Sequence, residues 1–163
     1  MKETIEFKIG KATYFSKLEV TSFKKIVIDA GEVSEPTFDG LIAKDPTLLY
    51  IPNTQNIEAV GALKIPNGEY KEKVFTKSKT NENSKDYTFE LGWIVSLKSG
   101  YGNKLVEILS TYTTNVYATV RQENKIMKHL LEKFGFTISG NSYKSDRNNY
   151  DIELYIKKEK NAL

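Results

Sequence analysis

The sequence of 163 residues contains no cysteine and only one histidine, His129. The lack of cysteine excludes disulfide bonds, a thiol nucleophile and any zinc site built from thiolates. A single histidine also excludes a metal site that needs several imidazoles. Because the neighbours of His129 are mostly lysines and glutamate, we expect this side chain to be solvated, and the sequence predicts no metal site.

Long apolar runs are missing as well. No segment approaches the roughly 18 apolar residues that a membrane-spanning helix requires. The N-terminal segment MKETIEFKIGKATYF contains acidic residues and lacks an apolar core, so it does not resemble a secretory signal. Together with the lack of cysteine, these features favour a cytoplasmic protein that does not enter a membrane.

The sequence also has little excess of charge, with a formal net charge of +3. Residues 1–95 carry 13 basic and 14 acidic side chains, whereas residues 96–163 carry 11 basic and 7 acidic ones. The excess in the second part is too small to indicate nucleic-acid binding, but it favours an anionic ligand.

The residues that are present indicate one globular domain, 1–163. The chain is 39% hydrophobic and contains 8 Phe and 10 Tyr, which is enough apolar surface for a core. The polar segment 71–86 (KEKVFTKSKTNENSKD) is the exception, and we expect it to form a mobile loop between strands.

The second half of the chain shows the clearest secondary structure. Tyr87–Val95 is apolar on both faces, which is typical of a central strand. Apolar residues at helical spacing predict helices over Asn103–Tyr112 and Glu123–Phe134. Further strands are expected at Asn115–Val120, Phe136–Ser139 and Tyr150–Ile156. This order predicts an α/β fold that contains a βαβ unit.

Between the central strand and the first of these helices lies the loop Ser99-Gly100-Tyr101-Gly102-Asn103. Unpaired amides in the first turn of a helix attract anions, and glycines let the backbone approach a phosphate closely. Lys98 and Lys104 add positive charge. A plain strand-to-helix turn would use the same residues, and the loop matches neither the Walker nor the dinucleotide pattern.

From Tyr87 onward, three collinear pieces of the sequence resemble the GNAT superfamily of acyl-CoA-dependent N-acyltransferases. They are FELGWIV, SGYGNKLVEIL and NVYATVRQENKIMKHLLEKFGF. In that family the central strand precedes a Q/R-x-x-G-x-G/A loop, which is followed by a strand and an N…A…L-E-K-x-G-F helix. The resemblance implies a mixed, mostly antiparallel sheet of six to seven strands. This sheet is flanked by helices and splayed between its two central parallel strands.

The resemblance implies that coenzyme A, as acetyl-CoA, binds to this half of the chain. The backbone of Ile94 and Val95 would pair with the pantetheine arm, and Asn124 would lie near it, although Asn124 also fits the N-cap of a helix. Arg121 would reach the phosphates or be solvated. The residues expected to hold the pyrophosphate are Lys98, Ser99, Gly100, Tyr101, Gly102 and Asn103.

Glu90 corresponds to the strand carboxylate that many members of the family use as a general base. An amine acceptor must lose a proton before it attacks the thioester, and burial of a carboxylate raises its pKa toward the useful range. The alternative is a structural glutamate paired with a lysine.

Two positions depart from the pattern of the family. Leu97 stands where the loop pattern begins with Gln or Arg, and Leu131 stands where many members carry a tyrosine that protonates the leaving thiolate. The general acid is therefore unassigned, with Tyr143, Tyr150 or a water molecule as candidates.

The expected function is N-acetyl transfer from acetyl-CoA to a small-molecule or peptide amine by direct attack, with Glu90 as the base. Leu97 and Leu131 favour an alternative, a non-catalytic acyl-CoA-binding module. The basic second part and the segment SYKSDRNNY leave open an acyltransferase that modifies nucleic acid. A homodimer is also left open.

Overall fold

The structure, a computed structural model, describes residues 5–52 and 57–159. The chain divides into two compact units, which are described separately below. Unit 1 comprises Met1–Ile65 and Gly92–Leu109, and unit 2 comprises Pro66–Leu91 and Ser110–Leu163.

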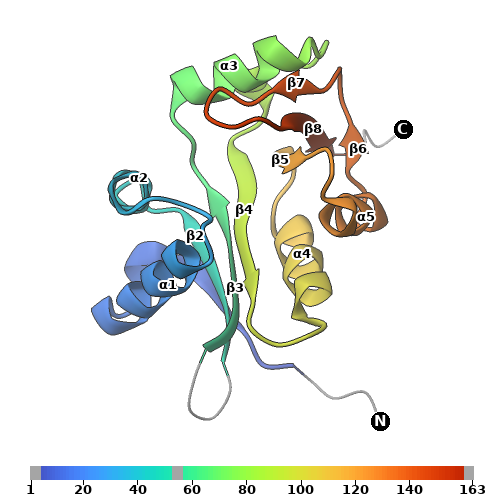
Figure 1. Ribbon diagram of the computed structural model, residues 1–163. Helices are drawn as coiled ribbons and strands as arrows, with labels where there is room; N and C mark the ends of the chain where they lie inside the picture. The colour runs from blue at the N-terminus through green and yellow to red at the C-terminus, as the bar shows by residue number, and fades with distance from the viewer. Residues whose placement is uncertain (1–4, 53–56, 160–163) are drawn as a thin grey trace. The chain divides into compact units, whose positions relative to one another are not determined.

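Strands and helices alternate along most of the chain (Figure 1). The strands are β1 Lys8–Lys11, β2 Thr47–Pro52, β3 Ile57–Lys64, β4 Phe89–Ser96, β5 Val116–Arg121, β6 Thr137–Ile138, β7 Tyr143–Lys144 and β8 Asp151–Lys157. The helices are α1 Lys17–Asp29, α2 Glu35–Ile42, α3 Gly68–Ser78, α4 Tyr101–Tyr112 and α5 Lys125–Lys133, with short 3-10 helices η1 Ala12–Tyr14 and η2 Ser84–Asp86.

The strands follow the order β1-β2-β3-β4-β5-β8-β6, and β7 also pairs with β8. The pairs β1–β2, β2–β3, β5–β8, β6–β8 and β7–β8 are antiparallel, whereas β4–β5 is parallel. The predicted α/β class with a mostly antiparallel sheet is confirmed. Within residues 5–52 and 57–159 the sheet has eight strands, where six to seven were predicted. The count includes β6 and β7, whose two residues each are too short to show a pattern.

In unit 1, helices α1 and α2 cover one face of the strands with an aromatic core. The ring of Trp93 stacks on Phe38 at 4.9 Å, and Phe23 lies 5.9 Å from Trp93. Helix α1 starts with a capping box between Ser16 and Glu19, which stabilises a helix by about 1 kcal/mol. The buried members of this core are Ala12, Phe15, Phe23, Val27, Phe38, Leu48, Tyr50, Val60, Ala62, Trp93 and Val95.

Helix α4 packs closely against β3 at Gly61, which has no side chain. A Cβ on Gly61 would lie 2.8 Å from Leu109 Cδ1 and 2.9 Å from Ile94 Cδ1. The neighbours of Gly61 in β3, Val60 and Ala62, belong instead to the core under α1 and α2. Because side chains alternate along a strand, α4 lies on the other face of β3.

In unit 2, strand β8 is buried on both faces. Leu154 and Ile156 pack with the side chains of α3, while Glu153 contacts Lys128 of α5 at 3.0 Å. The side chains of β8 therefore alternate between the two helices. The core under α3 comprises Val74, Phe75, Tyr87, Tyr117, Leu154 and Ile156, with Tyr143 packed against it.

The prediction of a polar loop over 71–86 was wrong. Lys71–Ser78 belongs to helix α3, and Ser84–Asp86 forms η2. The few apolar residues of the segment occur at helical spacing. Val74 and Phe75 lie on one face of the helix with Tyr70 and Ser78, and Val74, Phe75 and Ser78 are buried. The loop was predicted from the average composition of the segment, which does not show that its apolar residues share one helix face.

The C-terminal end of α3 is held by a close approach of two backbones. Gly140 has a φ of +74°, and a Cβ at this position would lie 2.2 Å from the Ser78 carbonyl oxygen. The Asn141 amide donates to the same oxygen at 2.6 Å. Only glycine fits this contact, which anchors the helix that carries Tyr70.

Gly140→Ala is therefore expected to destabilise the protein by at least about 2 kcal/mol, because both the φ angle and the close contact oppose a methyl group. Gly31→Ala is the matched control. Gly31 has a φ of +76° but nothing within 4 Å of its Cβ position, so its substitution measures the cost of the φ angle alone. Urea unfolding of both variants checks the difference. Equal losses would contradict the close approach.

Candidate functional site

Glu90 lies at the start of β4, in unit 2, next to β5. The parallel ladder between the two strands pairs Phe89 with Val116 and Glu90 with Tyr117. Side chains of paired residues project from the same face of a sheet. The Glu90 side chain is therefore beside Tyr117, and its residue is only 3% exposed.

Three tyrosines of unit 2 surround this carboxylate. Burial, followed by the negative charge of Glu90, raises the pKa of Tyr117, of Tyr70 and of Tyr143. The three side chains come from β5, α3 and β7, so the fold gathers them from distant parts of the sequence. Phenols with raised pKa values stay protonated at neutral pH and can donate hydrogen bonds to an acceptor.

The three tyrosines differ in exposure. Tyr117 is fully buried and its ring packs edge-on against Phe75, with centroids 5.3 Å apart. Its hydroxyl makes no hydrogen bond of ordinary geometry to another described residue. Tyr143 is half-buried, whereas Tyr70 is 45% exposed and its hydroxyl lies next to Thr119. Tyr70 therefore stands between the buried carboxylate and solvent.

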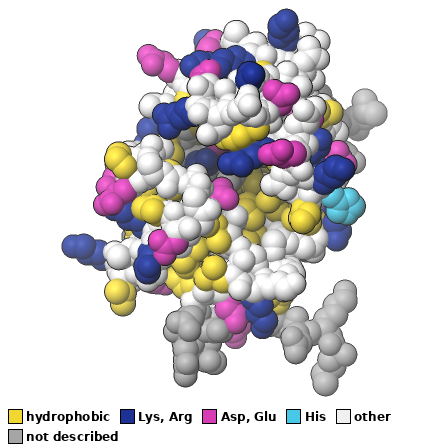
Figure 2. Space-filling view, viewed as in Figure 1, with side chains coloured by type: hydrophobic (Ala, Val, Ile, Leu, Met, Phe, Trp, Pro, Cys, Tyr) yellow, Lys and Arg dark blue, Asp and Glu magenta, His cyan; other side chains and the backbone are white. Residues whose placement is uncertain are grey.

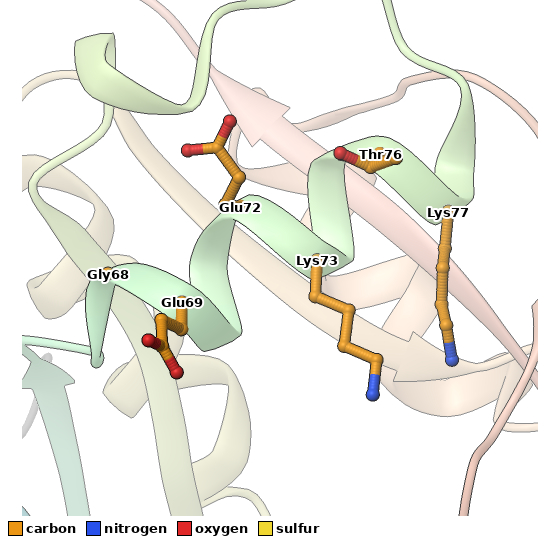
Figure 3. A pocket seen from close by; sticks show the side chains of 6 residues that line it. All are labelled: Gly68, Glu69, Glu72, Lys73, Thr76 and Lys77. Atoms are coloured by element: carbon orange, nitrogen blue, oxygen red, sulfur yellow. The ribbon is translucent and has the colours of Figure 1, made fainter.

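The outer face of α3 carries charged side chains over a surface hollow of about 620 Å³. Lys73 and Lys77 extend to the same side of the helix, away from Glu72 (Figure 3). Both lysines bind Asp146, in the loop after β7, and they hold the pKa of Asp146 down at about 2. This clamp joins α3 to the segment that carries Tyr143. Glu90 is not among the residues that line the hollow.

In β4, Trp93 adopts a φ of +53°, which is unusual for a bulky side chain. Such a conformation costs about 1–2 kcal/mol, and the packing of Trp93 between Phe38 and Phe23 offsets it. The regular pleat is therefore interrupted between Glu90 and the end of the strand. The sequence pattern, which placed Trp93 in a regular alternation, gave no sign of this feature.

The loop after β4 belongs to unit 1. Its start is fixed because the Leu97 amide donates to the Glu58 carbonyl oxygen at 2.7 Å. Gly100 has a φ of +93° and open space around its Cβ position. Ser99 is exposed, and α4 begins at Tyr101. These features match the strand, glycine loop and helix expected from the sequence.

The loop fits a bound phosphate. The amides of the first turn of α4 have no partner within the helix, and that turn contains no acidic residue. Lys98 lies 3.9 Å from Glu58 and Lys104 lies 3.8 Å from Glu107. These are long, partly exposed ion pairs, which an incoming phosphate can replace at small cost.

The remaining predicted cofactor residues are placed as follows. The Ile94 side chain packs towards Gly61, and Val95 belongs to the core under α1 and α2. Any contact of these two residues with a ligand would therefore use the backbone. Gly102 and Asn103 lie in the first turn of α4. Their roles, like those of the loop residues, stay predictions.

In unit 2, Asn124 caps helix α5, and its Oδ1 accepts from the Met127 amide at 3.1 Å. The Arg121 guanidinium lies 4.2 Å from the centre of the Tyr150 ring. Leu131 is fully buried in the core. A cofactor contact by Asn124 stays a prediction, since the cap occupies one side of its amide.

Tyr70 and Tyr117 are the site residues that the sequence did not reveal. Tyr117 lies in the expected strand Asn115–Val120, and Tyr70 precedes the segment 71–86 that is expected to be a loop. Tyr70 and Val74 are four residues apart, so a helix that includes both places them on the same face. The partnership of Tyr117 with Glu90 depends on strand register, which a single sequence does not specify.

Within residues 5–52 and 57–159, no group of three or more His, Cys, Asp or Glu side chains is arranged to hold a metal ion. In the same residues, no helix has the length and apolar composition needed to cross a bilayer. The single histidine, His129, is exposed on α5, in agreement with its expected solvation (Figure 2).

The raised pKa of Tyr117 predicts a loss of stability in alkali. A phenol whose pKa is higher in the folded state stabilises the fold fully below its unfolded pKa of about 10 and loses that contribution above it. We expect Tyr117→Phe to reduce the alkaline decline by up to about 1.4 kcal/mol per pH unit. Urea unfolding between pH 8 and pH 11 measures the slope. The control is Tyr112→Phe, at a half-exposed position; an equal effect of both changes would contradict the prediction.

Neither a protein-family profile nor a curated protein matches the chain. Solved structures match it over nearly its whole length. An acyl-CoA N-acyltransferase from Pseudomonas aeruginosa is 15% identical with a TM-score of 0.66, and the match covers 94% of this chain and 99% of that one.

Two further structures have TM-scores of 0.62. The ribosomal-protein-S18-alanine N-acetyltransferase from Escherichia coli is 16% identical, with 97% of this chain and 99% of that one covered. The protein yncA from Salmonella typhimurium, in a structure with its cofactor acetyl-CoA, is 9% identical, with 99% and 98% covered. At sequence identities this low, the similarity shows a shared fold and nothing more. The chain therefore has the fold of the GNAT acyl-CoA N-acyltransferases, which confirms the resemblance found in its sequence.

Proposed function

We propose that this protein is an N-acetyltransferase that moves an acetyl group from acetyl-CoA to an amine. The observation that supports this best is the Glu90 carboxylate, buried beside three protonated phenols on a GNAT fold. A buried carboxylate costs several kcal/mol of solvation. Its presence is easier to explain by proton transfer than by stability.

The loop between β4 and α4 would bind the diphosphate of acetyl-CoA. The first-turn amides of α4 and the side chains of Lys98 and Lys104 supply the positive potential. Gly100 lets the backbone take its φ of +93° without a Cβ. When bound, acetyl-CoA supplies an electrophilic thioester carbon and a thiolate leaving group.

Glu90 would act on the acceptor amine. An amine is protonated at neutral pH and has no lone pair for attack, so its nitrogen must first lose a proton. The Glu90 carboxylate accepts that proton, directly or through a water molecule. The phenol hydroxyls around Glu90 lie in an environment of low polarity, where hydrogen bonds are strengthened.

A proton must also reach the departing thiolate. Leu131 cannot donate a proton, and it is fully buried in the core. Another group must therefore act as the general acid. Tyr143 has a phenol kept protonated beside Glu90, whereas the ring of Tyr150 packs on Arg121. Of the two tyrosines considered from the sequence, Tyr143 is therefore the better candidate.

The non-catalytic acyl-CoA-binding module is the alternative, and Leu97 and Leu131 are the residues in its favour. A wild-type protein that binds coenzyme A but acetylates no amine in a broad panel would support it. Action on nucleic acid, a homodimer and a cytoplasmic location stay predictions from the sequence.

Glu90→Gln tests the proposed base. We expect kcat for acetylation of an amine to fall by about 10²–10⁴-fold, because the amide cannot accept the proton. The affinity for acetyl-CoA should be unchanged. Release of the coenzyme A thiol and mass spectrometry of the product measure the transfer.

Glu153→Gln is the control for this prediction. Glu153 is also a buried carboxylate of unit 2, but it pairs with Lys128 on α5. This variant should keep the wild-type kcat after correction for its folded fraction. A Glu90→Gln variant as fast as wild type would remove Glu90 from the mechanism.

Gly100→Ala tests the cofactor loop. The methyl group opposes the positive φ that the loop requires, so we expect the Kd for acetyl-CoA to rise about tenfold, equivalent to about 1.4 kcal/mol. Gly31→Ala is again the control, because it carries the same kind of strain in open space. Calorimetry with both variants distinguishes the two positions. Equal affinities would place the diphosphate elsewhere.

A further inference from the structure

This inference rests on the proposed function, and it concerns the group that faces Glu90 across the β4–β5 ladder. Tyr117 is paired in register with Glu90 and is fully buried. Its ring is held by Phe75, at 5.3 Å, and by neighbours in the core under α3. The hydroxyl therefore has little freedom to leave the side of the carboxylate.

The groups that act on the Tyr117 hydroxyl are first of all Glu90, and then Tyr70 and Tyr143. Among the described residues it has no further hydrogen-bond partner. A phenylalanine would fill the same space in the core under α3. What the hydroxyl adds is its interaction with the Glu90 carboxylate.

Tyr87 offers a close comparison within the same core. It is also fully buried, and its ring lies 5.5 Å from Phe75. Its hydroxyl, however, donates to Glu82 at 3.0 Å, away from Glu90. The two tyrosines share packing and differ in what the hydroxyl faces.

We propose that Tyr117 is a positioning residue for acetyl transfer, whose buried hydroxyl orients the Glu90 carboxylate towards the acceptor amine. A hydroxyl donor beside a carboxylate fixes the direction in which its oxygens point. The donor also limits the rotamers from which the carboxylate accepts a proton, so that the productive one is populated before the amine arrives. Tyr117 touches neither the amine nor the thioester in this role.

Tyr70 and Tyr143 are two further tyrosines of unit 2 whose pKa the charge of Glu90 raises, after burial. Tyr143 is half-buried and Tyr70 is 45% exposed, so both are nearer to solvent than Tyr117. Their positions suit contact with an entering acceptor. Tyr117, behind them, suits the orientation of the carboxylate.

The test compares Tyr117→Phe with Tyr87→Phe in stability, kcat and KM. Tyr117→Phe should lose about tenfold in kcat after correction for its folded fraction, with the KM for acetyl-CoA unchanged. Tyr87→Phe loses the hydrogen bond to Glu82 in the same core, so it should be less stable than wild type. It should nevertheless keep the wild-type kcat.

The outcomes separate the inference from the proposed function. If wild type acetylates amines and Tyr117→Phe matches wild type in kcat, the positioning role is overturned and the proposed function stands. If Tyr117→Phe loses activity only in proportion to its folded fraction, its role is structural and the inference also fails. If wild type transfers no acetyl group to any amine, the proposed function fails and takes the inference with it.

Discussion

The Glu90 carboxylate is almost fully buried in unit 2, beside three tyrosines from different elements of the fold. An isolated carboxylate in such a place costs several kcal/mol. The fold surrounds it with phenols, whose hydroxyls can donate to a carboxylate while their rings fill the core. Burial, together with the charge of Glu90, raises the pKa of Tyr70, Tyr117 and Tyr143, so the three phenols stay protonated at neutral pH.

Strand β4 connects the chemistry to the cofactor loop along the chain. Its first residues carry Glu90, and its last residue precedes the loop that leads into α4. Between them, Trp93 holds a φ of +53° against the aromatic core of unit 1. The strain is confined to one residue whose packing is strong enough to maintain it. In β4, therefore, Trp93 and Val95 belong to the core under α1 and α2, and the proposed base lies near the other end of the strand.

Much of this arrangement could be predicted from the sequence where the pattern was local. The apolar run of β4, the helical spacing of α5 and Gly135, with its φ of +94°, after that helix are readable from neighbouring residues. Helix α3 was missed because a few apolar residues on one face were diluted by lysines. The partners of Glu90 could not be predicted, because strand register and the packing of α3 bring together residues far apart in the sequence.

The central claim is that an acceptor amine meets the Glu90 carboxylate. Infrared difference spectroscopy tests it most directly, by comparing the complex with coenzyme A before and after addition of an amine that the protein acetylates. The account predicts a change in a carboxylate band that is absent from the spectrum of Glu90→Gln and present in that of Glu153→Gln. Spectra of wild type and Glu90→Gln that respond identically to the amine would contradict it.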